Sequence, residues 1–182
     1  MKNGGISFWH AELGGPPPRR APLPGDRSAD ICIVGAGFTG LWAAYYLKRA
    51  RPDLAITVLE RDFAGFGASG RNGGWCSGEF GWSREKYLAT GSRAGVIAFE
   101  RAGREAVAEV VRVCAAEGID ADIHETEALT YACSPAQWAR LRAEHDSARA
   151  WEVPESRIGL IGAAEARARH AVAGPMGALV RR

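Results

Sequence analysis

The sequence has no long run of one charge. Its 182 residues include 23 lysines and arginines and 21 aspartates and glutamates, which leaves a formal net charge of +2. No basic run is longer than a pair, such as Arg19-Arg20. A nucleic-acid-binding domain normally gathers its basic side chains on one face or along one helix. We therefore expect no nucleic-acid partner.

Cysteine and histidine are also scarce. The chain has 4 histidines and 4 cysteines, and the cysteines are Cys32, Cys76, Cys114 and Cys133. They form no C-x-x-C pair, and no histidine stands at metal-ligand spacing from any of them. The pattern predicts no metal site and favours buried free thiols in a reducing compartment.

No apolar run is long enough to span a bilayer. The segment Ile31–Leu47 is apolar, but it falls short of the ~20 residues that a membrane helix needs and is broken by Gly35, Gly37 and Gly40. Residues 1–5 are not followed by the apolar core of a secretory signal. We expect a cytoplasmic protein without a membrane span.

The composition that remains is globular, with 47% hydrophobic and 24% charged residues. The length suits one domain or part of a larger protein. Residues 1–28 are expected to form an extended arm, because the prolines and glycines of 14–25 prevent a helix or a central strand. Phe8 and Trp9 are expected to dock on the body of the protein or on a part of it that lies outside this chain.

Three segments after the arm have the pattern of a βαβ unit. Residues 30–34 are a β-branched apolar run that predicts a buried strand of a parallel sheet. A helix is expected over 39–51, ended by Pro52, and a second buried strand over 55–59. The unit has the expected length of about 30 residues, so we predict an α/β, Rossmann-like fold.

The later segments predict a long helix and a small antiparallel β element. Apolar residues recur every three or four positions through 93–117, which indicates an amphipathic helix. Two short alternating runs predict an antiparallel pair within 122–133. The other expected elements are a helix that begins at Ser134-Pro135 and ends near Trp151, a helix over 163–169 and a strand from 177.

The turn between the first strand and its helix carries a glycine pattern, Gly35-Ala36-Gly37-Phe38-Thr39-Gly40. It has the context that a dinucleotide site requires, with a strand before it, a helix opening on it and a second strand after it. The first glycine permits a tight turn, the second lets the backbone approach a pyrophosphate, and the third lets the helix pack on the strand. The start of the helix offers N–H groups to the phosphates.

An acid follows the second predicted strand. Glu60 stands after Gly40 at the spacing of about 20 residues at which a carboxylate accepts the hydroxyls of an adenosine ribose. Such a carboxylate would repel a 2′-phosphate, which disfavours NADP. The alternative is a solvated acid at the end of a strand. Arg61 either neutralises a phosphate or is a surface charge.

A second glycine-rich stretch reads Gly67-Ala68-Ser69-Gly70-Arg71-Asn72-Gly73-Gly74. An NAD-binding domain does not need such a stretch, whereas a flavin dinucleotide site does, because the chain must follow the pyrophosphate toward the isoalloxazine ring. Ser69 and backbone N–H groups can bind phosphate oxygens, and Arg71 can offset phosphate charge or face the flavin. Large aromatic residues, which a flexible linker would not carry, flank the stretch: Phe63, Phe66, Trp75, Phe80 and Trp82.

These motifs, in Ala29–Leu41, Glu60 and Gly65–Gly74, resemble the FAD-dependent oxidoreductases of the glycine/D-amino-acid oxidase superfamily. Within it, the sequence looks most like the gamma-glutamylputrescine oxidoreductase group. The resemblance covers nearly the whole chain, and its motifs are specific over residues 29–74. It implies that FAD is bound by Gly35, Gly37, Phe38, Thr39, Gly40, Glu60, Arg61, Gly67, Ala68, Ser69, Arg71, Asn72, Gly73 and Gly74.

The resemblance also implies an activity. Such enzymes transfer a hydride from the carbon next to an amine nitrogen to flavin N5, and the imine then hydrolyses. The reduced flavin is reoxidised by oxygen or another acceptor. The substrate would be a small amine or amino acid. No nucleophile or obligatory base of the family maps onto this sequence, so no catalytic residue is assigned.

Members of this superfamily run to more than twice this length. Residues 29–182 would then be the N-terminal part of the FAD-binding oxidoreductase domain, with 119–170 the start of the substrate-domain insertion. We expect a truncated chain, inactive alone, or one piece of a split enzyme that needs a complementary C-terminal polypeptide.

Two other interpretations remain open. The first is an NAD-binding Rossmann dehydrogenase domain, against which the glycine-rich stretch after Glu60 weighs. The second is a non-enzymatic remnant that binds a nucleotide or a partner chain. Fold alone does not separate them, because function depends on the site.

Overall fold

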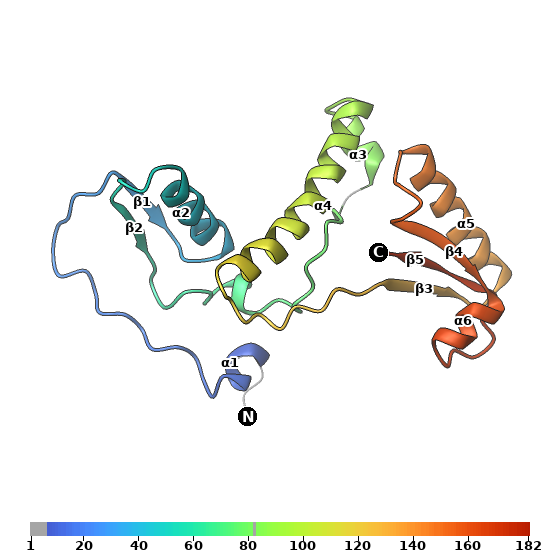
Figure 1. The fold of residues 1–182 in the computed structure, drawn as a ribbon, viewed down its shortest axis with the longest axis horizontal. Helices are drawn as coiled ribbons and strands as arrows, with labels where there is room; N and C mark the ends of the chain where they lie inside the picture. Colours follow the sequence, from blue (N-terminus) through green and yellow to red (C-terminus); the bar gives the residue numbers. More distant parts are fainter. Residues whose placement is uncertain (1–6, 82) are drawn as a thin grey trace. The chain divides into compact units, whose positions relative to one another are not determined.

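The computed structural model describes residues 7–81 and 83–182. Residues 1–5, where the sequence predicts no secretory signal, and Trp82, one of the predicted flanking aromatics, therefore lie outside the described residues. The chain divides into two compact units, Met1–Trp75 and Cys76–Arg182, whose elements are labelled in Figure 1.

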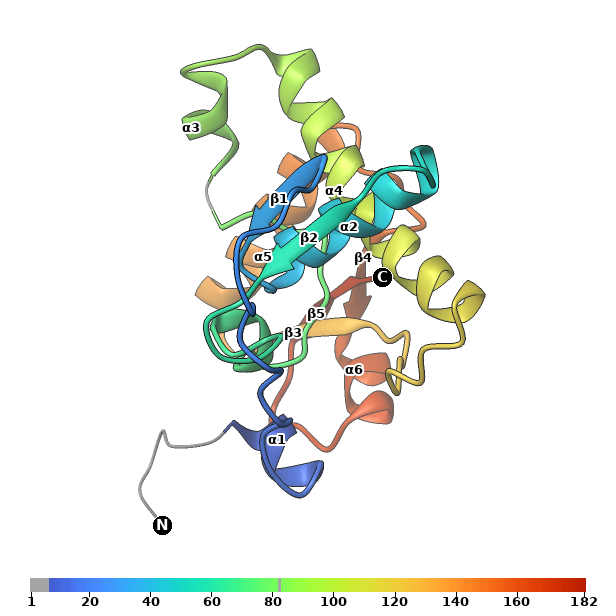
Figure 2. The same cartoon turned by 90° about the vertical axis from the view of Figure 1, so that its left-hand side faces the viewer.

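The first unit contains the predicted βαβ motif. Strands β1 and β2 pair in parallel, from Ile31 opposite Ile56 to Val34 opposite Leu59. Figure 2 shows the two strands side by side with α2 against them. The Rossmann-like interpretation of this segment is confirmed. The elements of the unit are α1 Phe8–Glu12, β1 Ile31–Val34, α2 Phe38–Ala50, β2 Ile56–Leu59 and the short 3-10 turn η1 Ala68–Gly70.

The prediction that β1 is a fully buried strand is wrong. Its residues alternate between half-buried and exposed, and Val34 keeps 86% of its surface exposed. Helix α2 packs on the face that carries Ile33, since a Cβ on Gly40 would lie 3.2 Å from Ile33 Cγ2. Cys32 and Val34 point to the opposite face, because successive strand residues alternate.

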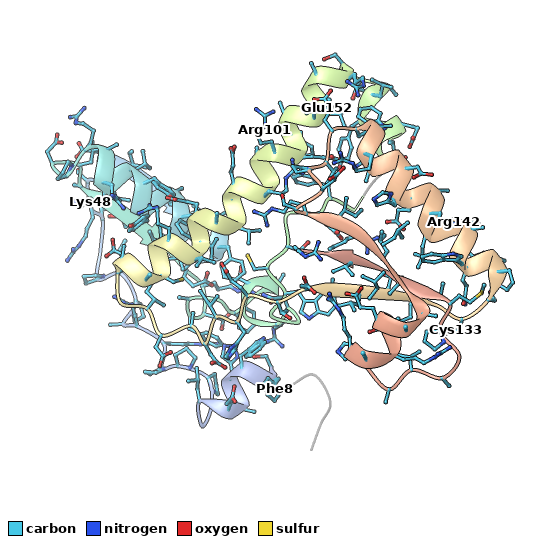
Figure 3. The ribbon with its side chains drawn as sticks, turned by 45° about the vertical axis from the view of Figure 1, so that its right-hand side comes forward. Phe8, Lys48, Arg101, Cys133, Arg142 and Glu152 are labelled. Carbon is cyan, nitrogen blue, oxygen red and sulfur yellow. The ribbon has the colours of Figure 1, made fainter. Side chains whose placement is uncertain are left out.

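All four cysteines are free, as predicted, but they are less buried than predicted. Cys32 is exposed on the uncovered face of β1, and Cys76 is exposed on irregular backbone. Cys133 is exposed in the turn between β3 and α5 (Figure 3). Only Cys114 on α4 is half-buried.

The described residues of the second unit, 76–81 and 83–182, form four helices and a three-stranded sheet. The long helix expected near 93–117 is present, and the helix expected after Ser134 begins at Pro135, with the Ser134 hydroxyl accepting from Gln137 N at 3.3 Å. The elements are α3 Arg84–Leu88, α4 Arg93–Ala116, β3 Ala128–Ala132, α5 Pro135–Ala150, β4 Ile158–Gly162, α6 Ala163–Arg169 and β5 Gly177–Arg181.

The antiparallel element exists, but its predicted pairing within 122–133 is wrong. Residues 121–127 form no strand, and β3 pairs with β5, from Ala128 opposite Arg181 to Ala132 opposite Gly177. Strand β4, which the sequence did not predict, pairs with the other edge of β5 and gives the order β3-β5-β4.

The core of the second unit lies on both faces of β5, the central strand. On one face Leu179 packs with the buried Leu141 and Ala148 of α5. On the other face Ala178 and Val180 pack with Ala166 of α6. Because helices cover both faces, four of the five β5 residues are buried.

Candidate functional site

The glycine turn after β1 has two positions that require glycine. Gly35 has φ +99°, a conformation that side chains with a Cβ rarely adopt, and its N–H donates to Leu59 O at 2.7 Å. A Cβ on Gly40 would overlap the carbonyl oxygen of Gly35. These constraints fix the start of α2 at the carboxyl end of β1.

The start of α2 is met by the second glycine-rich stretch. Phe38 N, at the first position of the helix, donates to the Ser69 hydroxyl at 2.9 Å. A Cβ on Gly37 would lie 3.1 Å from that hydroxyl, and Gly65 N donates to Ala36 O at 2.9 Å. The structure therefore brings the two glycine motifs together around the N-terminus of one helix.

The first turn of α2 contains no acidic residue, and its cap residue Gly37 contributes no side-chain hydrogen bond. The positive end of the helix dipole is therefore not offset by an acid of its own first turn. Such a helix start favours an anion.

The carboxylate of Glu60 lies at the edge of the same turn. Its Oε2 accepts from Ala36 N at 2.8 Å and its Oε1 accepts from Asp62 N at 3.0 Å. The hydrogen bond from Ala36 N, followed by that from Asp62 N, lowers the pKa of Glu60 below its usual value, because both donors favour the charged form. The site therefore holds an ionised carboxylate beside the glycine turn.

The stretch 67–74 is shaped by hydrogen bonds of its own side chains. Asn72 Nδ2 donates to Ser69 O at 2.7 Å, and Asn72 Oδ1 accepts from Gly74 N at 2.8 Å. Arg71 Nε donates to Phe66 O at 2.9 Å, and its guanidinium lies 5.3 Å from the centre of the Phe66 ring. In this structure Arg71 is thus held against Phe66.

The remaining predicted cofactor residues lie on the surface around this centre. The Arg61 side chain is 85% exposed and pairs with Asp62 at 3.2 Å. Four others are exposed: Thr39, Gly67, Ala68 and Gly73.

Two residues of the arm contact the site, and sequence reasoning missed one of them, His10. Trp9 Nε1 donates to Asn72 O at 2.8 Å, so the predicted docking is confirmed for Trp9, whereas Phe8 is 69% exposed. His10 is buried, with its ring 5.2 Å from that of Phe63 in an edge-to-face contact. The only sequence signal was the Phe8-Trp9 pair, because a lone histidine beside it has no distinctive pattern.

The second unit has an apolar groove of about 340 Å³ between the segment 76–80 and α4. Gly78 and Gly103 allow this segment to approach the helix, since a Cβ on Gly78 would lie 2.8 Å from Gly103 O. Cys76 and Phe80 contribute to its lining.

Residues 7–81 and 83–182 contain no group of three or more histidine, cysteine, aspartate or glutamate side chains placed to hold a metal ion. Within the same ranges, every helix is too short or too polar to cross a membrane.

Comparison with known proteins adds a family match. The model of the family described as FAD dependent oxidoreductase matches residues 30–181. The chain is 45% identical over 64 residues to "Probable oxidoreductase OrdL" of Rhizobium meliloti (strain 1021), a match that covers 35% of this chain and 14% of that protein.

Two other relatives match over similarly short stretches. Gamma-glutamylputrescine oxidoreductase of Escherichia coli (strain K12) is 53% identical over 47 residues, which is 26% of this chain and 11% of that protein. Thiamine thiazole synthase of Schizosaccharomyces pombe is 47% identical over 51 residues, 28% of this chain and 14% of that protein. Each matched stretch thus spans only a small part of the length of its relative.

Proposed function

The chain belongs to the FAD-dependent oxidoreductase family, and from this premise we propose that residues 31–74 bind the adenosine and pyrophosphate part of FAD. The observation that carries the proposal is the meeting of three groups at one turn. They are the start of α2 at Phe38, the hydroxyl of Ser69 and the carboxylate of Glu60.

The glycine turn fits a pyrophosphate. An added Cβ on Gly35 would have no atom within 4 Å, and one on Gly37 would meet only the Ser69 hydroxyl, so phosphate oxygens can approach the backbone N–H groups of the turn closely. Ser69 already supplies a hydroxyl within 2.9 Å of Phe38 N, and such a hydroxyl can also donate to a phosphate oxygen. In this proposal Ser69 joins the two glycine motifs around one anion.

The Glu60 carboxylate fits a ribose with free hydroxyls. Its lowered pKa keeps it ionised at neutral pH, and an ionised carboxylate accepts hydrogen bonds and repels a 2′-phosphate. The two backbone donors, Ala36 N and Asp62 N, hold it at the turn. This arrangement favours FAD over NADP.

We propose that the whole protein oxidises a C–N bond of an amine or amino acid. Bound FAD supplies the hydride acceptor, and the protein binds and orients it. The support is the resemblance of residues 29–74 and the similarity to a protein named for gamma-glutamylputrescine. A thiamine thiazole synthase matches over a similarly short stretch, so the identities alone do not select the substrate.

We also propose that catalysis needs protein surface beyond the described residues. The face of β1 that carries Val34 is uncovered, with 86% of this apolar side chain exposed. Burying such a side chain is worth about 1.5–3 kcal/mol. A complementary polypeptide that packs on this face would gain that energy.

Titration of the purified chain with FAD tests the proposed site. We expect one FAD per chain, seen as a perturbed visible absorption spectrum and quenched flavin fluorescence. Glu60→Ala should weaken binding by about tenfold, since it removes a charged hydrogen-bond acceptor for the ribose hydroxyls. Gly37→Val should weaken it further, because the side chain fills the phosphate approach.

Two matched controls separate local from general effects. Gly25→Val changes a glycine of the arm that has no atom within 4 Å of an added Cβ, and Glu105→Ala removes an exposed carboxylate of α4. Both should bind FAD as the parent chain does. Equal affinity in the parent, Glu60→Ala and Gly37→Val would overturn the site.

A further inference from the structure

We propose that three side chains of the arm, Trp9, His10 and Arg19, called here the N-terminal clamp, form a positioning element that holds the stretch 67–74 in its cofactor-binding shape. The proposal rests on the proposed FAD site. It assigns a role to arm residues that belong to neither glycine motif but lie close to the stretch 67–74.

The stretch 67–74 is rich in glycine and has no buried residue to keep its backbone ordered. Half of its residues are glycine, which loses more conformational freedom on folding than any other residue. None of its residues is buried, so no hydrophobic core fixes them. Ordering such a stretch costs about 1–2 kcal/mol per residue, and other contacts must offset that cost.

The clamp supplies such contacts at one end of the stretch through Trp9. The indole N–H donates to Asn72 O, and a Cβ on Gly74 would lie only 2.7 Å from an atom of the Trp9 ring. Gly74 itself has φ +78°. The indole therefore lies directly against the backbone of Gly74.

A chain of hydrogen bonds links this contact to the helix start. Trp9 holds the backbone of Asn72, the side chain of Asn72 donates to Ser69 O at 2.7 Å, and the Ser69 hydroxyl accepts from Phe38 N. Displacing Asn72 would therefore release Ser69, which is the residue that joins the two glycine motifs. Trp9 acts on the site through these neighbours.

His10 and Arg19 make further contacts with the site. His10 Cε1 lies 3.3 Å from the position of a Cβ on Gly70, with the ring edge-on to Phe63. Arg19 forms an ion pair with Asp62, whose side chain is only 8% exposed. Asp62 N in turn donates to Glu60, so the clamp touches the supports of both proposed cofactor contacts.

The neighbouring residues of the clamp provide an internal comparison. Phe8 lies on α1 with 69% of its surface exposed (Figure 3), and Leu13 is 79% exposed just after the helix. Both are large apolar residues within a few positions of Trp9, yet their surfaces remain open. Trp9 and His10, in contrast, contact residues of the stretch 67–74.

The test measures two properties of Trp9→Ala, Trp9→Phe and the control Leu13→Ala in the full chain. The first is FAD affinity by fluorescence titration, and the second is amide hydrogen exchange of the chain without FAD. We expect about tenfold weaker FAD binding by Trp9→Ala, a smaller loss by Trp9→Phe and no change by Leu13→Ala.

The pattern of exchange distinguishes positioning from general stabilisation. Trp9→Ala should speed exchange in Ser69–Gly74 and leave β1 and β2 unchanged. Faster exchange across both strands, or FAD affinity that falls equally in Leu13→Ala, would overturn the clamp. A parent chain that binds FAD while Trp9→Ala matches it in both measurements would overturn the clamp alone, and a parent chain that binds no FAD would overturn both proposals.

Discussion

Two glycines of the proposed site differ sharply in what a methyl group would meet. A Cβ on Gly40 would overlap the carbonyl oxygen of Gly35, whereas a Cβ on Gly67 has no atom within 4 Å. Backbone atoms in a tight turn cannot move aside as a flexible side chain can. Equal substitutions at these two positions should therefore have very different effects.

We expect Gly40→Ala to lower the free energy of unfolding by about 3 kcal/mol, through overpacking that the turn cannot relieve. Gly67→Ala should change it by less than about 0.5 kcal/mol. Urea unfolding followed by circular dichroism measures both. A Gly40→Ala variant as stable as Gly67→Ala would contradict the geometry of the turn.

Glu60 should give the stability of the first unit a defined pH dependence. Its pKa is lowered in the folded chain, so its contribution is present above the unfolded pKa of about 4.3 and is lost as the pH falls through the lower folded pKa. The stability difference between the parent and Glu60→Gln should be constant from about pH 8 to pH 5 and shrink below. Unfolding midpoints across this range measure it, with Glu105→Gln as the control.

The meeting of residues at the candidate site was predictable where a spacing rule applied. The glycines of 35–40 and Glu60 follow such a rule, and the structure places them at one turn. The contacts of Asn72 with Trp9 and of His10 with Phe63 were not predictable, because they join residues far apart in the sequence. Asn72, for example, receives the Trp9 indole N–H across 63 positions.

At the scale of elements, the start of α5 depends on one hydroxyl. Ser134 accepts from Gln137 N, and removing such a cap costs about 1 kcal/mol. We expect Ser134→Ala to lower the thermal unfolding midpoint of the second unit. Ser147→Ala, an exposed serine inside the same helix, should leave it equal or slightly higher, because alanine is the better helix former. A lower midpoint in Ser147→Ala than in Ser134→Ala would contradict this account.

Helices were predicted better than strands because their signals are local. The apolar period of 93–117 is a property of helix α4 itself, and the Ser134-Pro135 cap stands at the start of helix α5. The pairing of β3 with β5 joins residues about fifty positions apart, and no turn between them reveals it. Strand β4 was missed because Gly159 and Gly162 interrupt its apolar run.

At the scale of the whole molecule, the boundary between the two units is an accessible cleavage site. Trp75 is 91% exposed on irregular backbone, whereas the exposed Phe8 and Phe38 lie in helices. Brief treatment with chymotrypsin should cut first after Trp75, because proteases select exposed, irregular segments. Mass spectrometry should find the fragments 1–75 and 76–182, and Trp75→Ala should lose this cut. Early cuts scattered within α4 or β5 would contradict the division.

The uncovered face of β1 carries Cys32, a thiol that is exposed. The rate at which Cys32 is alkylated therefore reports whether this face of the sheet is covered. A polypeptide that packs on this face would slow the alkylation of Cys32. Cys133, in the turn between β3 and α5 of the second unit, would still be alkylated and would serve as the internal reference. Peptide mapping of alkylated Cys32 and Cys133 would therefore detect a partner that covers β1, the strand that leads into the proposed cofactor site.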